Sequence, residues 1–270
     1  MSEIKNSVDF PVNEFYRDGI KVMEYTLTDS TNKRARIYAE KEDATVPALF
    51  IAKEQTAGRG RLGRSFFSPA QSGVYMTLLL KAPKNAESFA KITSLCAVAV
   101  LDSIYGMFGI TLDIKWVNDL YLNTKKCAGI LAESFEVNGC RYVAIGIGIN
   151  LFCVDFPEDL RTKAGSILTY PYCYKEEQDT QKKELAFSIA KGIIDALDAE
   201  DTSQYMYRYR QRSCVIGKRI SFSVGGVTQR GKAVGITDMG ALEVVFENGE
   251  KQELSTGEIS VFIEEKGEDI

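Results

Sequence analysis

The sequence predicts an α+β fold, with a mixed or antiparallel sheet flanked by helices and a small C-terminal β-barrel. Strand-like apolar runs alternate with helical periodicities up to residue 216, and short, closely spaced strands follow from residue 217. The 270 residues are 45% hydrophobic and 26% charged, which is typical of a folded globular chain and argues against extended disorder. We therefore expect two domains, residues 1–216 and residues 217–270.

In the first half of the chain, apolar runs bounded by caps and turns define the expected elements. Residues 1–20 look polar and extended. Asp29 or Ser30 is a candidate N-cap for a helix over residues 31–41. Gly109 closes a long and largely apolar helix over residues 88–108. Strands are expected over residues 21–26, 48–52, 73–80 and 114–117.

In the second half, asparagine–glycine pairs mark two hairpins. Asn138 and Gly139 join strands over residues 128–137 and 141–151. Apolar residues at helical spacing predict a helix over residues 183–197, and a second helix is expected over residues 202–212. The short strands of the C-terminal domain are expected over residues 219–224, 232–236, 242–246, 251–254 and 259–263, with a turn at Asn248-Gly249.

The composition excludes several classes of protein. The chain has no histidine, which excludes Ser-His-Asp hydrolysis, Cys-His proteolysis and zinc sites with histidine ligands. Its 33 basic and 37 acidic residues give a net charge of −4, which argues against a wholly basic nucleic-acid binder. The six cysteines show no C-x-x-C spacing. With no signal-like N-terminus and no uncharged run of about 18 apolar residues, we expect a reduced, cytoplasmic protein that does not enter a membrane.

The most informative segment is a loop in which three arginines alternate with glycines. The loop contains Gln55, Gly58, Arg59, Gly60, Arg61, Gly63 and Arg64. It matches the dinucleotide fingerprint G-x-G-x-x-G literally, but it leads into a strand, whereas a dinucleotide-binding loop opens a helix. Arginines this close repel one another unless an anion joins them, so we interpret the loop as an anion site. The alternative is a flexible, solvated loop.

Three further segments place polar residues or glycines at strand ends. Asp119 could hold Mg²⁺ through its oxygens and Lys115 could face a phosphate, although an ordinary turn around a buried Trp116 explains the same residues. Lys126 could point its ammonium into a strand-end cavity or lie in a solvated hairpin tip. The alternating glycines of residues 146–150 indicate either close approach by a ligand or close packing.

Together these segments resemble the biotin–protein ligase family. The matching motifs are Ser30-Thr31-Asn32, residues 55–64, Lys115-Trp116-Val117-Asn118-Asp119, residues 126–133, residues 146–150 and residues 257–260. Their order and spacing agree over residues 24–262. Val117 replaces the family's usual proline, and Phe66 stands where some members have tryptophan. The DNA-binding domain of some members has no counterpart, so the resemblance is to the shorter, non-repressor class.

The resemblance implies a class II synthetase-like catalytic domain with an SH3-like C-terminal barrel, and a two-step reaction. Biotin is activated by ATP as biotinyl-5′-AMP and then transferred to a lysine of a biotin carboxyl carrier domain. The implied biotin site is Ser30, Thr31, Asn32, Gln55, Arg59, Gly60, Arg61 and Lys126. The implied nucleotide or adenylate site is Gly58, Arg59, Arg61, Arg64, Asn118, Lys126 and Asn150.

The implied catalytic residues are Arg61, Lys126, Lys115 and Asp119. Asp119 is the candidate ligand of a Mg²⁺ ion that accompanies ATP, or the group that receives the acceptor lysine. The arginine loop is expected to be mobile without ligand and to close over the adenylate, because a lid protects a reactive anhydride from water.

Other functions remain open. A lipoate–protein ligase would share the fold and the adenylate chemistry, although the complete arginine loop favours biotin. A nucleic-acid-binding module is suggested by the mixed aromatic and basic residues 205–212. At helical spacing, however, these residues fit a helix packed at the domain junction, and we expect no DNA partner. A ligase-like binding protein with weak turnover is a third possibility, and edge strands of the main sheet could pair two subunits.

Overall fold

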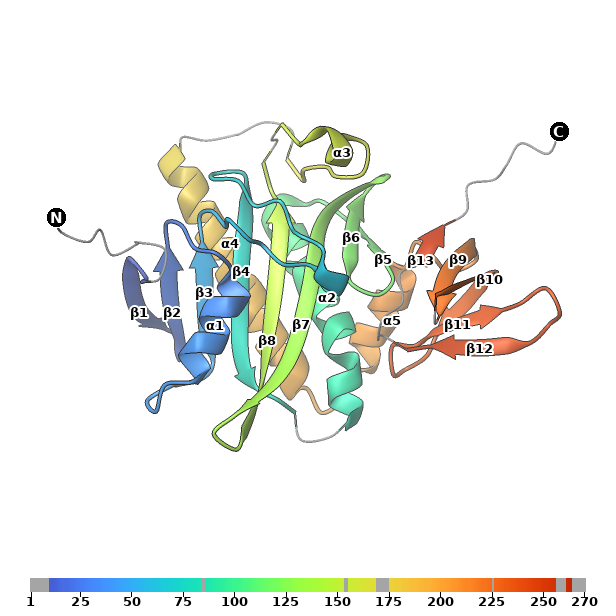
Figure 1. The fold of residues 1–270 in the computed structure, drawn as a ribbon, viewed down its shortest axis with the longest axis horizontal. Coiled ribbons are helices and arrows are strands. Elements are labelled where there is room, and N and C mark those ends of the chain that lie inside the picture. Colours follow the sequence, from blue (N-terminus) through green and yellow to red (C-terminus); the bar gives the residue numbers. More distant parts are fainter. Residues whose placement is uncertain are drawn as a thin grey trace.

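The computed structural model describes most of the chain. The described residues are 10–83, 86–152, 155–168, 175–224, 226–255 and 261–263. Two sheets are present among them, a large mixed sheet and a smaller antiparallel sheet near the C-terminus (Figure 1). This is the α+β architecture that the sequence predicts.

The large sheet has eight strands. They are β1 (Asn13–Arg17), β2 (Ile20–Tyr25), β3 (Ala48–Ala52), β4 (Gly73–Lys81), β5 (Asp113–Lys115), β6 (Asp119–Leu122), β7 (Lys125–Val137) and β8 (Cys140–Asn150). Their order across the sheet is β1-β2-β3-β4-β8-β7-β6-β5. Strands β2 and β3 run parallel, and the other neighbours are antiparallel.

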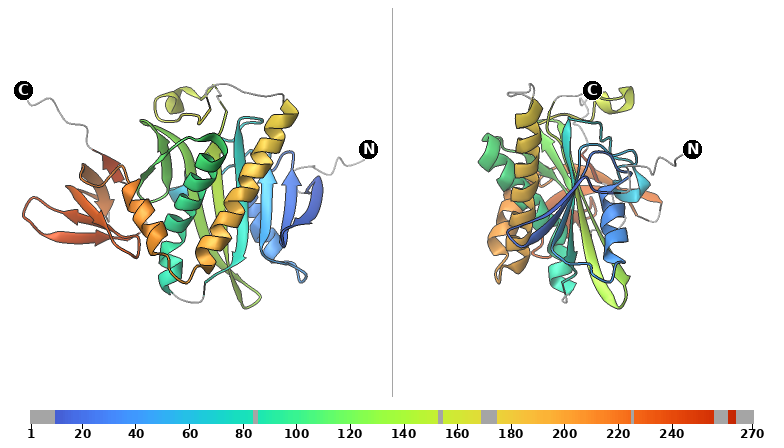
Figure 2. Two further views of the ribbon diagram at one scale, coloured as in Figure 1. Left: turned by 180° about the vertical axis from the view of Figure 1, so that it is seen from behind. Right: turned by 90° about the vertical axis from the view of Figure 1, so that its left-hand side faces the viewer.

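Helices cover both faces of this sheet. The α-helices of the described residues are α1 (Thr31–Ala39), α2 (Ala86–Phe108), α3 (Glu158–Arg161), α4 (Lys175–Asp198) and α5 (Ser203–Gln211). Helix α1 packs on one face, and α2 and α4 cover the opposite face (Figure 2). Helix α2 is long and apolar enough over Ala90–Phe108 to cross a membrane, but 61% of this stretch is buried inside the protein. It therefore fits the core helix of a globular domain.

Strand β8 shows how the sequence separates the two faces. Its isoleucines belong to the core beneath α2 and α4. Its glycines alternate with them and therefore face α1 and the arginine loop. The hairpin joining β7 to β8 has Asn138 at φ 51° and Gly139 at φ 72°, as its Asn-Gly sequence predicts.

Four elements were not expected from the sequence, one of them a 3₁₀ helix over Arg61–Gly63 within the arginine loop. The segment expected to be a polar lead-in contains β1, which pairs with β2 through a tight turn at Asp18 and Gly19, both with positive φ. The expected strand over residues 114–117 ends earlier, at Lys115, and the chain turns before β6 begins at Asp119. Strand β6 and the short helix α3 were missed.

The smaller sheet contains five antiparallel strands. They are β9 (Arg219–Val224), β10 (Val227–Ile236), β11 (Leu242–Val245), β12 (Lys251–Leu254) and β13 (Val261–Ile263), in the order β12-β11-β10-β9-β13. The predicted domain boundary at residues 216 and 217 falls between α5 and β9. Part of the last expected strand, residues 259–260, lies outside the described residues.

Candidate active site

A cavity of about 610 Å³ lies between the start of α1, the arginine loop and the ends of β5 to β8. Its walls come from segments far apart in the sequence, including Lys163 near α3 and Phe262 of β13. Strands β7 and β8 form its floor, where Gly129, Gly146 and Gly148 leave room above the sheet. The cavity therefore joins the described motifs of the sequence, whereas the motif at residues 257–260 lies outside the described residues.

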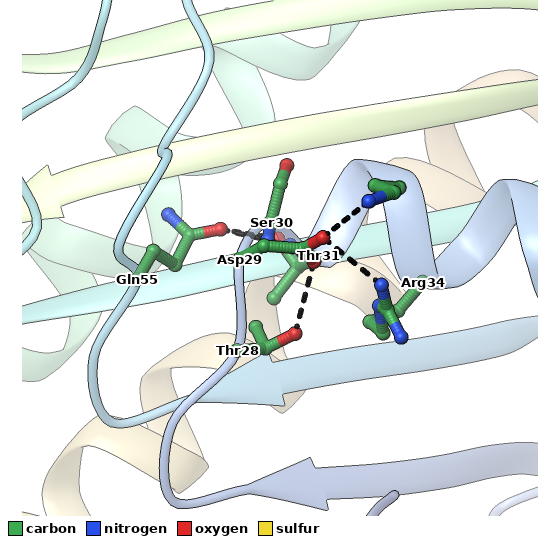
Figure 3. Close-up of polar contacts among 7 residues, drawn as sticks. Thr28, Asp29, Ser30, Thr31, Arg34 and Gln55 are labelled. Atoms are coloured by element: carbon green, nitrogen blue, oxygen red, sulfur yellow. Dashed lines mark hydrogen bonds and ion pairs between the residues drawn. The ribbon is translucent and has the colours of Figure 1, made fainter. Parts of the chain in front are cut away.

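The entry into α1 is fixed by polar contacts rather than by a conventional cap. Ser30 is the N-cap residue, yet its side chain makes no capping hydrogen bond. The Ser30 amide instead donates to Asp29 Oδ1 at 2.7 Å, and Arg34 donates to Asp29 Oδ2 at 3.0 Å (Figure 3). Gln55 Oε1 accepts from the Thr31 amide at 2.8 Å and from its hydroxyl at 3.1 Å. The arginine-loop segment thus supplies the acceptor for the first helical turn.

The charge of Asp29 is well stabilised. Burial disfavours its ionised form, but hydrogen bonds from Lys33 and the Ser30 amide, together with the charge of Arg34, outweigh burial and lower its pKa. The helix N-terminus also favours a negative charge at this place. Asp29 therefore stays ionised near neutral pH and holds the Ser30-Thr31-Asn32 segment in position.

Asn32 sits in a closely packed polar cluster. Thr77 of β4 donates its hydroxyl to Asn32 Oδ1 at 2.6 Å and lies 2.8 Å from the Thr31 hydroxyl. Asn32 Nδ2 donates to Glu133 Oε2 at 3.0 Å. Gly146 is opposite, and an added Cβ there would lie 2.1 Å from Asn32 Oδ1. Glycine is therefore required at residue 146 for the asparagine to occupy this place.

The arginine loop is held over the cavity by two of its side chains. Arg59 Nη2 lies 3.3 Å from Glu133 Oε1, and Arg61 Nη1 donates to Asn118 Oδ1 at 3.3 Å. Burial lowers the pKa of Arg61. Leu62 has a left-handed backbone with φ 58° and a side chain that is 52% exposed. An exposed leucine in this strained conformation fits a segment that changes place when a ligand binds.

A lysine–carboxylate pair lies across the cavity from the loop. Lys126 Nζ is 2.6 Å from Asp119 Oδ1, and both side chains are partly exposed. Lys115 Nζ lies 5.6 Å from the ring centroids of both Tyr121 and Phe262. Burial lowers the pKa of Lys115 and raises the pKa of Tyr121 to about 12. The two rings hold a half-buried ammonium at the cavity wall, and an anion beside it would offset the cost of burying its charge.

The charge of the lining is strongly positive although the whole chain is acidic. The basic lining residues are Arg59, Arg61, Arg64, Lys115, Lys126 and Lys163. Asp119 is the one acidic residue among the described lining residues, and Lys126 already neutralises it. The cavity therefore attracts an anion at this end and offers neutral hydrogen-bonding groups at the α1 end.

Most residues predicted for the site line the cavity, and two do not. All eight residues of the predicted biotin site belong to the lining. Gly58 packs against the Phe66 carbonyl, which would lie 2.5 Å from an added Cβ. Asn150 lies at the end of β8 and donates to the Gly165 carbonyl at 3.2 Å. Sequence reasoning gave no role to Thr77, which does not line the cavity, and missed Phe262.

The described residues offer no preformed protein cluster for Mg²⁺. Across the described part of the chain, no group of three or more His, Cys, Asp or Glu side chains could hold a metal. Asp119, the predicted ligand, is already bound by the Lys126 ammonium. Mg²⁺ bound through one or two carboxylates usually also needs substrate phosphates. A Mg²⁺ ion at this site would therefore have to arrive with the phosphates of a nucleotide.

The aromatic and basic residues 205–212 form a helix, as expected, and much of their polar surface is used inside the protein. Arg208 makes two 2.7 Å contacts with Asp102 of α2. The Tyr209 side chain is buried, and its hydroxyl donates to the Val117 carbonyl at 2.9 Å. These contacts favour the packed junction helix over a nucleic-acid surface.

Comparisons with known proteins agree with this geometry. Residues 24–150 match the model of the biotin/lipoate A/B protein ligase family, and residues 215–261 match the biotin protein ligase C-terminal domain. The bifunctional ligase/repressor BirA of Bacillus spizizenii is 34% identical over 229 residues, which cover 84% of this chain and 70% of that protein. A biotin–[acetyl-CoA-carboxylase] ligase of Paracoccus denitrificans is 41% identical over 127 residues, covering 46% of this chain and 52% of the relative.

A solved structure shares the fold. The biotin protein ligase of Aquifex aeolicus in complex with biotin and ATP superposes with a TM-score of 0.73 at 23% identity. The match covers 90% of this chain and 99% of the other. It supports the arrangement of both sheets and the helices around them.

Proposed function

Since this chain belongs to the biotin protein ligase family and is a ligase, we propose that its cavity forms biotinyl-5′-AMP and passes biotin to a protein lysine. The observation that carries this proposal is the division of the cavity into a neutral end and a cationic end. Hydroxyl and amide groups of Ser30, Thr31, Asn32 and Gln55 suit a ureido ring, which both donates and accepts hydrogen bonds. The cations suit a carboxylate meeting a phosphate.

In the first step, a biotin carboxylate oxygen attacks the α-phosphorus of ATP. A new P–O bond forms, the bond to the β-phosphate oxygen breaks, and pyrophosphate leaves. Two anions must approach each other, and two unit charges at 4 Å repel by about 4 kcal/mol at an effective dielectric of about 20. Arg59, Arg61 and Lys126 would offset that repulsion and stabilise charge on the α-phosphate. Lys115 would hold the nucleotide phosphates.

In the second step, a neutral acceptor lysine attacks the carbonyl carbon of the anhydride. A C–N bond forms, the C–O bond to AMP breaks, and AMP leaves as an anion. The attacking amine must lose a proton. Asp119, which holds the Lys126 ammonium at 2.6 Å, could bind the acceptor ammonium instead when an anionic ligand draws Lys126 away. Asp119 would then take its proton, which frees the neutral amine for attack.

The closing of the arginine loop belongs to the same proposal. The loop supplies Arg59 and Arg61 to the lining and joins the site through long contacts of 3.3 Å. These long side-chain contacts cross the cavity, so the tip of the loop can open for ligand entry and close over the anhydride while its base stays bound to the start of α1. Closure would exclude water and slow the loss of the intermediate.

We further propose a biotin carboxyl carrier domain as the acceptor, in the cytoplasm, with Mg²⁺ entering on ATP. DNA is not a proposed partner, because the arginines of α5 are engaged within the protein. Pairing of two copies through a free sheet edge stays a prediction.

The direct test is acid-dependent release of pyrophosphate from ATP. Biotin should stimulate release without any carrier, and lipoate at the same concentration should not. If only lipoate stimulates release, the substrate of this cavity is lipoate, and the enzyme is a lipoate ligase with the same adenylate chemistry. If neither acid stimulates pyrophosphate release, the cavity binds anions but does not form an adenylate, and the proposed function is wrong.

A further inference from the structure

Glu133 of β7 touches both ends of the active site, although no role follows for it from the reaction itself. Its Oε2 accepts from Asn32 Nδ2 at 3.0 Å, and its Oε1 lies 3.3 Å from Arg59 Nη2. Asn32 belongs to the start of α1, and Arg59 belongs to the arginine loop. One carboxylate therefore links the two segments.

The link is part of a continuous chain of polar contacts. Gln55 Oε1 accepts from Thr31, and the Thr31 hydroxyl lies 2.8 Å from Thr77 Oγ1. Thr77 donates to Asn32 Oδ1 at 2.6 Å, and Asn32 Nδ2 donates to Glu133. The chain begins at Gln55 and returns to the same loop segment at Arg59.

The direction of these hydrogen bonds is fixed. Because the Glu133 carboxylate can only accept, Asn32 Nδ2 must face it, which leaves Asn32 Oδ1 to accept from Thr77. Gly146 leaves no free space beside this amide, since an added Cβ would lie 2.1 Å from Asn32 Oδ1. A ligand that binds Thr31 or Asn32 would therefore also hold the Glu133 carboxylate in place.

We propose that Glu133 is a positioning residue that couples occupancy of the α1 end of the cavity to closure of the arginine loop. The proposal rests on biotin being the ligand at that end. A bound ureido group fixes Asn32, Asn32 fixes Glu133, and Glu133 holds Arg59 over the anionic end. Coupling of this kind is reciprocal, so closure of the loop also tightens the hold on biotin.

A carboxylate suits this role better than the amide of the same shape. Both Glu133 oxygens face donors, Asn32 Nδ2 on one side and Arg59 Nη2 on the other. In Glu133→Gln one of the two oxygens becomes an NH₂ group, which must face a donor. The substitution therefore breaks one of the two contacts without changing the volume of the side chain.

The test is tryptic cleavage within the arginine loop, measured by mass spectrometry with and without saturating biotin. Arg59 is 51% exposed, so the unliganded loop offers trypsin a site. In the unaltered protein, biotin should slow cleavage after Arg59 by about fivefold or more, within the usual range of coupling between sites. In Glu133→Gln and Glu133→Ala, biotin measured by calorimetry should still bind, and protection should fall below about twofold.

Glu136→Ala is the matched control, because Glu136 is an exposed glutamate of the same strand. It should keep full protection. Full protection in Glu133→Gln would overturn the proposal, as would an unaltered protein whose loop biotin does not protect. Loss of biotin binding in both Glu133 variants would also overturn it, because Glu133 would then belong to the pocket itself. If the unaltered protein does not bind biotin, it is the proposed function that fails.

Discussion

Half-buried cations are the residues on which the proposed chemistry depends most. Burial lowers the pKa of Lys115 and of Arg61, which means that the protein weakens their charged forms in the absence of ligand. An anionic ligand beside them reverses this effect, since an opposite charge favours the ionised form. Part of the affinity for ATP would therefore come from offsetting the cost of burying these two positive charges.

Lys115→Arg tests this point through pH. The lowered pKa means that the Lys115 ammonium loses its proton at a lower pH than an ordinary lysine. If the charge is needed, activity is present below that pKa and is lost as pH rises through it. Arginine stays protonated throughout, so the alkaline limb of kcat/KM for ATP should move to higher pH. Identical alkaline limbs in the two proteins would contradict a role for this ammonium.

Arg61→Gly tests the lid. Arg61 joins the arginine loop to Asn118 across the cavity. Without it, adenylate should still form, but it should leave the protein about tenfold faster, because roughly 1.4 kcal/mol of lost contact corresponds to that factor. Single-turnover assays without carrier measure the retained adenylate. Unchanged retention would show that the loop does not act as a lid through this side chain.

At the scale of elements, the two faces of β8 separate the core from the site. Gly146→Ala adds a methyl group that would lie 2.1 Å from Asn32 Oδ1, so either the start of α1 or the strand must shift. We expect the KM for biotin to rise about tenfold or more, since hydrogen-bonded polar sites lose at least this much when a partner is misplaced. The KM for ATP should change little.

Gly106→Ala is the matched control for this substitution. Gly106 lies in α2, and beyond the backbone of its own helix no atom lies within 4 Å of an added Cβ. It should leave both KM values unchanged and stabilise the fold by about 0.5–1 kcal/mol, because alanine favours helix over glycine. If the two substitutions change the KM for biotin equally, the space that Gly146 leaves for Asn32 is not needed for biotin binding.

The sequence predicts elements well where local chemistry decides them. Asn138-Gly139 marks its hairpin, and the apolar run before Gly109 marks α2. Strand β1 was missed because its side chains are mostly exposed and it is stabilised by pairing with β2, which no local pattern of core residues reveals. The Asp18-Gly19 pair was the available signal, since it is typical of a tight hairpin.

The sequence predicts the site residues that belong to recognisable motifs, and it does not predict the others. The basic side chains of the arginine loop, Lys115 and Lys126 indicate an anion site. Thr77 and Phe262 carry no such signal, because each reaches the site region only through the tertiary fold. In the sequence, Thr77 is one residue of an apolar strand, and nothing near it indicates a polar site. Its role as a hydrogen-bond partner of Asn32 follows from strand order rather than from sequence spacing.

At the scale of the whole molecule, the C-terminal sheet is joined directly to the active site. The Trp116 indole donates to the Gly240 carbonyl at 2.9 Å, and Arg210 of α5 donates to the Ile236 carbonyl at 2.7 Å. Arg210 also pairs with Asp238 in the same turn. Trp116 is 4% exposed and follows Lys115, so the small sheet helps to fix the position of a cavity cation.

Trp116→Phe tests this junction. It removes the indole N–H and leaves the buried Gly240 carbonyl without that donor, which typically costs about 1–3 kcal/mol. We expect a lower free energy of unfolding in urea and a raised KM for ATP, with the KM for biotin unchanged. Tyr207→Phe is the control, since Tyr207 is a 56% exposed aromatic residue on α5. If Trp116→Phe lowers the stability but leaves the KM for ATP unchanged, the contact between Trp116 and Gly240 does not help to position Lys115.

The most direct test of the account is to look for biotinyl-5′-AMP on the protein itself. The chain is incubated with biotin and ATP but no carrier, separated from free ligand, and analysed by mass spectrometry. We predict about one adenylate per chain, because a closed site retains its intermediate. Lys126→Ala should form adenylate about 100-fold more slowly or worse at saturating biotin, as expected for loss of a charge-stabilising group. Absence of adenylate from the unaltered protein, or its undiminished formation in Lys126→Ala, would contradict the assignment of this cavity.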